Sequence, residues 1–119
     1  MRSCDIRPTS LAALTLSILA THAFADAPVI ENIVLKNGQA HVTVSHPDSG
    51  WDHYADVWRI YGPDGQLLAE RILVHPHETE QPFTRSTEFR PPDGVTEISV
   101  IAACTDGDQS EPFRLSVAE

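Results

Sequence analysis

The sequence NGQAHVTVSH at residues 37–46 decides the fold class of this chain. Asn37-Gly38 is a strong signal for a two-residue hairpin turn, because both residues tolerate a positive φ angle. The residues after it alternate between apolar and polar side chains, which indicates a β-strand with one buried face, and His46 falls on the apolar face. An apolar run also precedes the turn at residues 27–36, so the sequence predicts a β-hairpin here.

Further short runs of β-branched and aromatic residues follow the hairpin and are separated by turn signals such as Gly62-Pro63-Asp64-Gly65. Trp58 lies in the middle of one run and is expected in the core. This pattern predicts a single immunoglobulin-like antiparallel β-sandwich of about seven strands. The expected strands are residues 27–36, 39–46, 53–61, 67–74, 83–89, 95–104 and 112–118.

Residues 1–25 are typical of a secretory signal peptide. They combine a weakly basic start, an apolar run over residues 11–20 that is too short to span a bilayer, and a small-x-small motif at residues 23–25. We expect cleavage before Asp26, which leaves residues 26–119 as the β-sandwich domain. The mature protein is then expected in the periplasm or outside the cell, with no membrane insertion after cleavage.

The chain is acidic, with a formal net charge of −9 at pH 7. Nucleic acids and anionic membrane surfaces attract basic proteins, so this charge argues against both as partners. The acidic residues are spread along the chain, which is typical of a solvated surface.

Removal of the leader takes Cys4 away and leaves Cys104 as the single cysteine, so no internal disulfide can form. An unpaired thiol persists in an oxidising compartment when it is buried, paired between chains or coordinated to a metal. Which of these three states Cys104 adopts therefore bears on the function of the protein.

The remaining ligand-type side chains are placed where strands begin and end. His46 ends the second expected strand, His53 opens the third, His75 and His77 follow the fourth, and Cys104 ends the sixth. Because successive strands of a sandwich mostly alternate in direction, all five are expected at one pole. Imidazole and thiolate ligands suit iron, copper or zinc, and not calcium or magnesium, so the sequence predicts a metal site at this pole.

Each of these residues also has an ordinary structural alternative. His46 and His53 could simply end and begin their strands, and Cys104 could pack as a small hydrophobe in the core. The segment His75-Pro76-His77 fits an exposed loop equally well. His41 lies on the polar face of its strand and is expected at the surface.

Several short motifs follow one another along the mature chain in the order found in a known family. They are Pro28-Val29-Ile30-Glu31, Val42-Thr43-Val44, His46-Pro47, His53-Tyr54, Trp58 and Ala103-Cys104. On these motifs the mature chain resembles the iron domain of superoxide reductases (desulfoferrodoxin and neelaredoxin) over most of its length. That resemblance implies the same immunoglobulin-like fold, in which four histidines surround an iron, a cysteine thiolate lies on its axis and one position stays open for superoxide.

The resemblance carries over to three of the five ligand positions. His46 and His53 match the His-Pro…His-Tyr motif, with a gap between them that is one residue longer, and Cys104 matches the axial cysteine. The first histidine of the family would fall at Asp26 and the last at Gly107, so these two positions differ. His75, His77, Asp26 or the new amino terminus would have to complete the site.

The leading hypothesis is an exported metal-binding β-sandwich that holds iron, or copper as the second choice, and reduces superoxide with an external electron donor. A carboxylate at position 52, 56 or 78 is a candidate for orienting a ligand imidazole, and the sequence does not choose among the three. The alternatives are a metal carrier without turnover and a non-metal module that binds a partner protein. The expected metal ligands are His46, His53, His75, His77 and Cys104.

Overall fold

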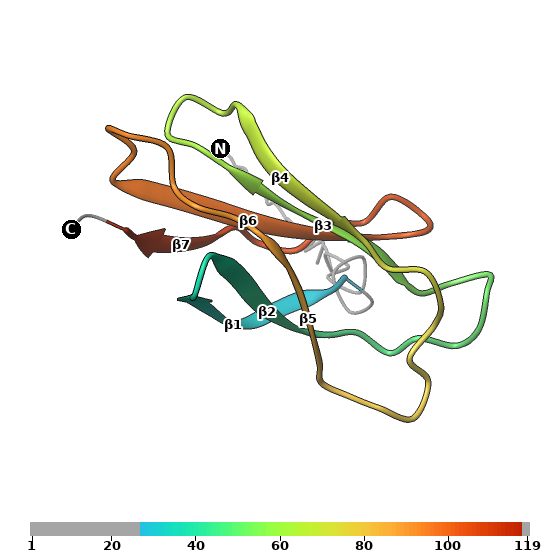
Figure 1. Cartoon of the computed structure of the whole chain (residues 1–119). Coiled ribbons are helices and arrows are strands. Elements are labelled where there is room, and N and C mark those ends of the chain that lie inside the picture. The colour runs from blue at the N-terminus through green and yellow to red at the C-terminus, as the bar shows by residue number, and fades with distance from the viewer. Residues whose placement is uncertain (1–26, 118–119) are drawn as a thin grey trace, which may run out of the picture.

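Two antiparallel β-sheets pack face to face in the computed structural model, which describes residues 27–117 (Figure 1). One sheet has the strand order β1-β2-β5 and the other β4-β3-β6-β7. This all-β arrangement confirms the predicted sandwich. The expected signal peptide and its cleavage before Asp26 lie outside the described residues. The strands are β1 (Val29–Lys36), β2 (Gln39–Ser45), β3 (Ala55–Tyr61), β4 (Leu67–Ile72), β5 (Phe83–Glu88), β6 (Glu97–Cys104) and β7 (Phe113–Ser116).

The β1–β2 hairpin forms as the sequence predicts. Asn37 and Gly38 both adopt positive φ angles, of 55° and 78°, which is the backbone twist that a tight two-residue hairpin turn needs. Lys36 then pairs with Gln39 across the turn, and this pairing fixes which face of β2 is buried.

Alternating side chains of β2 and β6 fill the space between the sheets. Val44 and Ala102 are fully buried. The same alternation continues to His46, which follows the last residue of β2, and to Cys104, which ends β6, and each of these two residues is 3% exposed. Trp58, in the middle of β3, is also fully buried, as expected. The period of two along a strand thus brings an imidazole and a thiol to one end of the core.

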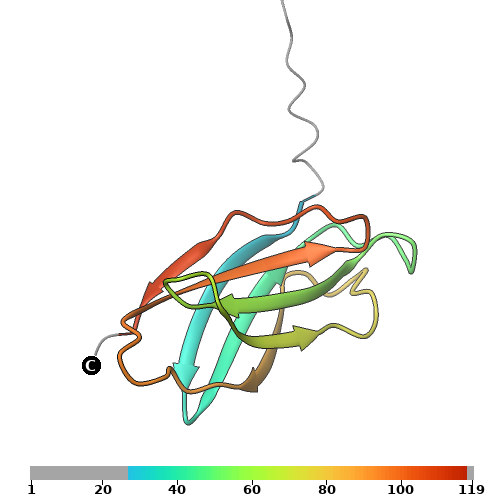
Figure 2. The ribbon, with the colours of Figure 1, turned by 90° about the horizontal axis from the view of Figure 1, so that it is seen from above.

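The strand ends meet at one pole as predicted. Ala55 at the start of β3 pairs with Cys104 at the end of β6, and Val44 near the end of β2 pairs with Phe83 at the start of β5. The loops that follow β2, β4 and β6 therefore lie at the same end of the sandwich (Figure 2). We call this end the His/Cys pole.

Several strands are shorter at this pole than expected, and for β3 and β4 this changes where predicted ligands lie. β3 starts at Ala55 and leaves His53 in the preceding turn, where its backbone N–H donates to the Gly50 carbonyl at 3.2 Å. β4 ends at Ile72, so His75 and His77 belong to a loop. Within residues 27–117, no helix is long and apolar enough to cross a membrane.

Candidate metal centre

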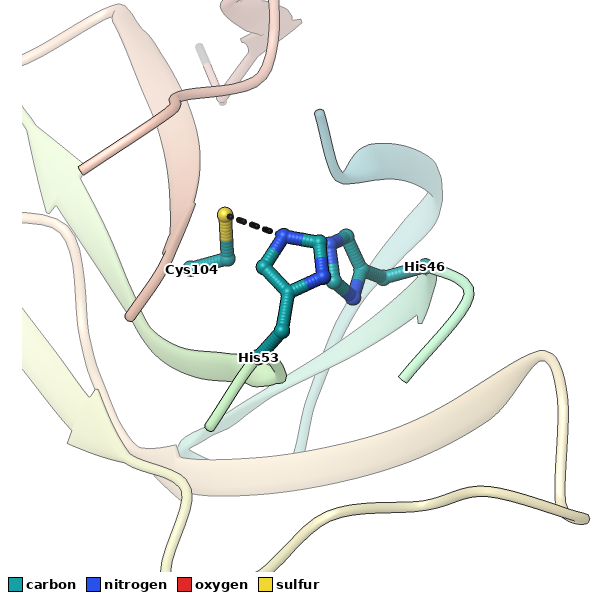
Figure 3. Close-up of side chains that lie close together, drawn as sticks. All are labelled: His46, His53 and Cys104. Atoms are coloured by element: carbon teal, nitrogen blue, oxygen red, sulfur yellow. Dashed lines mark hydrogen bonds between the residues drawn. The ribbon is translucent and has the colours of Figure 1, made fainter. Parts of the chain in front are cut away.

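Three of the five predicted ligands converge at the His/Cys pole (Figure 3). His46, His53 and Cys104 each offer one ligand atom, and these atoms all lie within 4.8 Å of one another. The Nε2 atom of His53 lies 3.8 Å from the Cys104 sulfur, and the two imidazole rings meet edge to face with 4.8 Å between their centroids. The described structure therefore contains a His/Cys group that can hold a metal ion. We call these three residues the His/Cys cluster.

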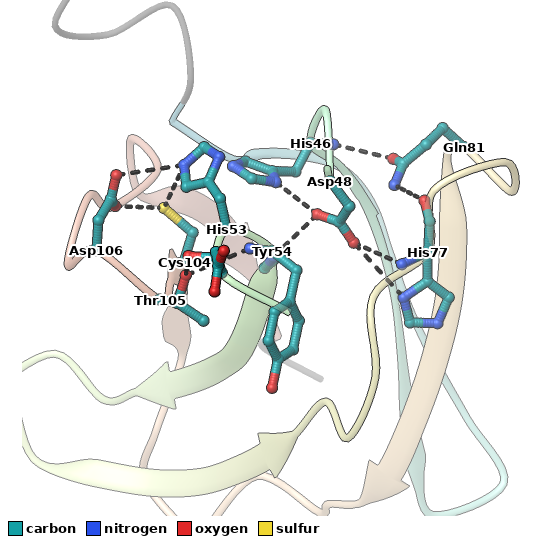
Figure 4. A network of polar contacts seen from close by, with 11 residues as sticks. His46, Asp48, His53, Tyr54, His77, Gln81, Cys104, Thr105 and Asp106 are labelled. Carbon is teal, nitrogen blue, oxygen red and sulfur yellow. Dashed lines mark hydrogen bonds and ion pairs between the residues drawn. The ribbon is translucent and has the colours of Figure 1, made fainter. Parts of the chain in front are cut away.

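A buried carboxylate orients the His46 ring. Nδ1 of His46 lies 2.5 Å from Oδ1 of Asp48, and both side chains are fully buried. A carboxylate accepts hydrogen bonds, so Nδ1 of His46 donates to Asp48, and Nε2 is the ring nitrogen left to bind a metal. That Nε2 is buried without a hydrogen-bond partner among residues 27–117, and Figure 4 shows it on the side of the ring that faces His53. Metal-binding histidines are commonly held in this way.

Asp48 also connects three segments of the pole. Its Oδ1 accepts a hydrogen bond from the backbone N–H of Ala55 at 3.0 Å, and its Oδ2 accepts one from the backbone N–H of His77 at 2.7 Å. The carboxylate thus fixes the end of β2, the start of β3 and the loop after β4. In the sequence, Asp48 follows the second expected strand, where aspartate is ordinary turn chemistry. Its position two residues after His46 was the signal that it could reach the ring.

The thiol of Cys104 is held by a second carboxylate. Its sulfur donates to Oδ1 of Asp106 at 2.8 Å, and the Asp108 backbone N–H donates to the same oxygen at 3.0 Å. Burial, and next the hydrogen bond to Asp106, raise the pKa of Cys104 to about 12. The bonds from Cys104 and Asp108 lower the pKa of Asp106. The metal-free protein therefore keeps a neutral thiol at pH 7, and a metal ion has to displace its proton.

We expect Cys104 to react slowly with alkylating reagents in the metal-free mature protein. The thiolate is the reactive form, and a pKa of about 12 leaves very little of it at pH 8. Alkylation by iodoacetamide should be slower than in the urea-unfolded chain by more than about a hundredfold. Mass spectrometry of timed samples measures both rates. Equal rates in the folded and unfolded protein would contradict this description of the thiol.

The structure does not bring His75 and His77 into the cluster. The His77 ring stacks on Phe83 with 3.8 Å between centroids, and its Nε2 lies 2.8 Å from Nη2 of Arg85. A guanidinium only donates hydrogen bonds, so the lone pair of Nε2 is already used. His75 is exposed, with its ring centroid 4.4 Å from that of His77. His77 supports the centre through its backbone bond to Asp48 instead.

The stability of the protein is expected to fall on acidification because of His77. Burial, and next the charge of Arg85, lower the pKa of His77, so the unfolded chain binds a proton more readily than the folded chain. Stability from this residue is complete at higher pH and is lost from about pH 6.5 downward. Urea midpoints between pH 7.5 and pH 5 should fall more for the wild type than for His77→Gln. His41→Gln is the control, and an identical slope in all three proteins would contradict the assignment.

The two positions at which the sequence departs from the superoxide reductase pattern can now be placed. Asp26 lies outside the described residues. Gly107 occupies a tight turn with a φ angle of +94°, and it has no side chain to offer a metal. The neighbouring Asp106 reaches the cluster instead, with Oδ2 at 3.2 Å from Nε2 of His53.

Comparisons with known proteins support the fold more strongly than they support a particular function. No family model matches the chain. A protein of Halomicrobium mukohataei named as a putative lipoprotein is 44% identical over 59 residues, which cover 50% of this chain and 29% of the relative. A superoxide reductase (1Fe-SOR) structure from Giardia intestinalis superimposes with a TM-score of 0.53 at 13% identity, over 77% of this chain and 97% of that one. The chain thus has a fold like that of a superoxide reductase, and it spans less than a third of the curated relative that it matches.

Proposed function

We propose that this protein is an exported metalloprotein that binds one iron ion through the His/Cys cluster and reduces superoxide there. The observation that carries the proposal is the convergence of two imidazoles and a thiol from three separate segments. In this cluster, Nε2 of His46 is buried and has no hydrogen-bond partner among the described residues, so it is available to bind a metal.

The donor atoms fit the proposed metal. Two imidazole nitrogens and one thiolate suit iron, copper and zinc. Iron is the first choice because a superoxide reductase with one iron has a similar fold, and copper is the second. Three donors also leave room for ligands from outside this cluster.

Bound iron would supply the electron that converts superoxide, with two protons, to hydrogen peroxide, and an external donor would return that electron. The residues of this chain hold and tune the ion. Asp48 fixes the His46 ring, and the thiolate of Cys104 adds electron density. The side chain of His53 is 22% exposed, so the cluster borders on solvent and a small anion can reach it.

Export is supported by two observations. Residues 1–25 have the pattern of a signal peptide. The relative from Halomicrobium mukohataei is named a putative lipoprotein, a class of protein that is exported. In such a compartment the buried position of Cys104 protects the thiol from unwanted disulfide formation.

The activity is tested by rapid mixing of superoxide with the iron-loaded, reduced mature protein. Reduction yields one peroxide for each superoxide, whereas spontaneous dismutation yields one peroxide for two. We expect the first ratio, and we expect the metal-free protein to show the second. Iron-loaded protein that forms peroxide no faster than buffer would contradict the proposed reaction.

A metal carrier without turnover is the second candidate. It is favoured by the positions of His75 and His77 outside the cluster, which leave fewer imidazoles around the metal than the resemblance to superoxide reductases implies. A carrier would retain metal, release it to a competing chelator within minutes, and form no peroxide from superoxide.

A further inference from the structure

The carboxylate of Asp106 lies against the His/Cys cluster, and we infer that it is a fourth metal ligand. This inference rests on the metal binding proposed above and defines its coordination. The ligand set is then two imidazole nitrogens, one thiolate sulfur and one carboxylate oxygen, from His46, His53, Cys104 and Asp106.

The first argument is the contact geometry. Oδ2 of Asp106 lies 3.2 Å from Nε2 of His53, and Oδ1 lies 2.8 Å from the Cys104 sulfur. The carboxylate therefore touches both of the ligand atoms on its side of the cluster (Figure 4). The Cys104 thiol donates a hydrogen bond to this carboxylate. A metal ion placed between the imidazole and the thiolate would meet the carboxylate at the same time.

The second argument is independent of Asp106. Nε2 of His46 is buried, has no hydrogen-bond partner among residues 27–117, and faces the same group from the other side. A buried polar atom left without a partner costs free energy, and a ligand that binds it removes that cost. The carboxylate of Asp106 and the unpartnered imidazole of His46 thus both favour the binding of a cation at the cluster.

The loop after β6 fixes the position of the carboxylate. The Gly107 backbone N–H donates to the Cys104 carbonyl at 2.8 Å, and the Cys104 backbone N–H donates to the Asp108 carbonyl at 3.0 Å. The positive φ angle of Gly107 allows this tight return of the chain. The same turn therefore places the Asp106 carboxylate against the cluster and has a glycine, with no metal-binding side chain, at position 107.

The identity of the fourth donor changes the chemistry of the site. Four donors of this mixed type suit a tetrahedral divalent ion such as Zn(II) or Co(II). They also suit Fe(II), which can accept a further ligand such as superoxide beside four protein donors. A carboxylate in place of an imidazole adds one negative charge next to the metal. That charge stabilises the more oxidised form of a bound iron, because the attraction between opposite charges increases with the charge of the ion.

Asp106→Asn tests the inference, because asparagine keeps a side-chain oxygen for the Asp108 N–H but loses the ligand charge. The probes are Zn(II), with affinity measured against a chromophoric chelator, and Co(II), with its visible absorption spectrum. We expect the variant to bind Zn(II) more weakly by more than about a hundredfold. The Co(II) d–d bands should lose the intensity of four-coordination while the sulfur charge-transfer band remains.

Two further variants separate a ligand from a neighbouring charge. The side chain of Asp52, which the sequence offered for orienting an imidazole, is exposed in the structure, whereas Asp48 holds the His46 ring. Asp52→Asn should therefore keep the Zn(II) affinity of the wild type. Asp106→His replaces the carboxylate with another donor and should restore the affinity to within about tenfold of the wild type. Melting temperatures of the metal-free variants check that each one folds.

The outcomes distinguish the ligand role of Asp106 from metal binding by the His/Cys cluster. Asp106→Asn that binds Zn(II) and Co(II) as Asp52→Asn does would overturn the role of Asp106 while leaving the metal site intact. Equal weakening in Asp106→Asn and Asp106→His would assign Asp106 to positioning alone, and would also overturn the inference. Wild-type protein that binds neither ion would contradict the proposed metal site itself.

Discussion

Replacing Cys104 with alanine is expected to remove the thiolate charge-transfer band of the iron-loaded protein. It should also weaken iron binding by more than about a hundredfold. The thiolate is the soft, negatively charged ligand of the His/Cys cluster. Without it only two neutral imidazoles remain, and two imidazoles alone bind iron weakly. Anaerobic reconstitution with Fe(II), followed by gel filtration, a visible spectrum and elemental analysis, measures both effects.

Val100→Ala is the matched control for this variant. Val100 is a fully buried residue on the same face of β6, and its truncation costs stability without touching the cluster. It should bind iron with the affinity and spectrum of the wild type. If Cys104→Ala kept the band and the affinity, Cys104 would be a core residue and not a ligand.

Replacing Asp48 with alanine is expected to cause the largest loss of stability among single changes at the His/Cys pole. The change leaves the Ala55 and His77 backbone N–H groups and the His46 Nδ1 without their acceptor in a buried position. Breaking such a buried charged network costs about 3 kcal/mol or more in the free energy of unfolding. The melting temperature should therefore fall by more than about 10 °C, as measured by circular dichroism.

Asp52→Ala provides the comparison for Asp48→Ala. Asp52 is an exposed carboxylate in the same turn, and its loss should change stability by no more than about 0.5 kcal/mol. Asp48→Asn keeps one acceptor oxygen and should lie between the two. Similar melting temperatures for Asp48→Ala and Asp52→Ala would show that Asp48 does not organise the pole.

The sequence predicted the sandwich because apolar and polar side chains alternate along its strands. Alternation along residues 39–46 and 95–104 fixed the buried faces, and turn residues such as Asn37-Gly38 marked the strand ends. The same parity placed His46 and Cys104 at the end of the core. A period of two therefore located part of the candidate site as well as the fold.

The same alternation could not choose among the histidines outside the strands. Strand direction brings His53, His75 and His77 to one pole, but it does not set which way a loop side chain points. Contacts between segments far apart in sequence decide that: Arg85 and Phe83 hold the His77 ring, and the turn before β3 turns His53 toward Cys104. Only the three-dimensional arrangement reveals these contacts.

The carboxylates were missed for a related reason. Asp48 and Asp106 follow His46 and Cys104 by two residues each, and aspartate at such positions is ordinary turn chemistry. What distinguishes them is hydrogen bonding to a ligand-type side chain, at 2.5 Å for the first and 2.8 Å for the second. The repeated spacing of two residues between a candidate ligand and an aspartate is the signal in the sequence for these contacts.

The metal content of the protein is the most direct test of the account. The mature protein would be purified from the periplasm without a histidine tag, and elemental analysis would be combined with melting curves before and after metal removal. We predict near-stoichiometric iron, or copper, and a lower melting temperature once the metal is removed, because an ion that binds only the folded state stabilises it. Protein that contains no transition metal, even after anaerobic reconstitution, and melts at the same temperature with and without Fe(II), Cu(I), Cu(II) or Zn(II), would contradict the account.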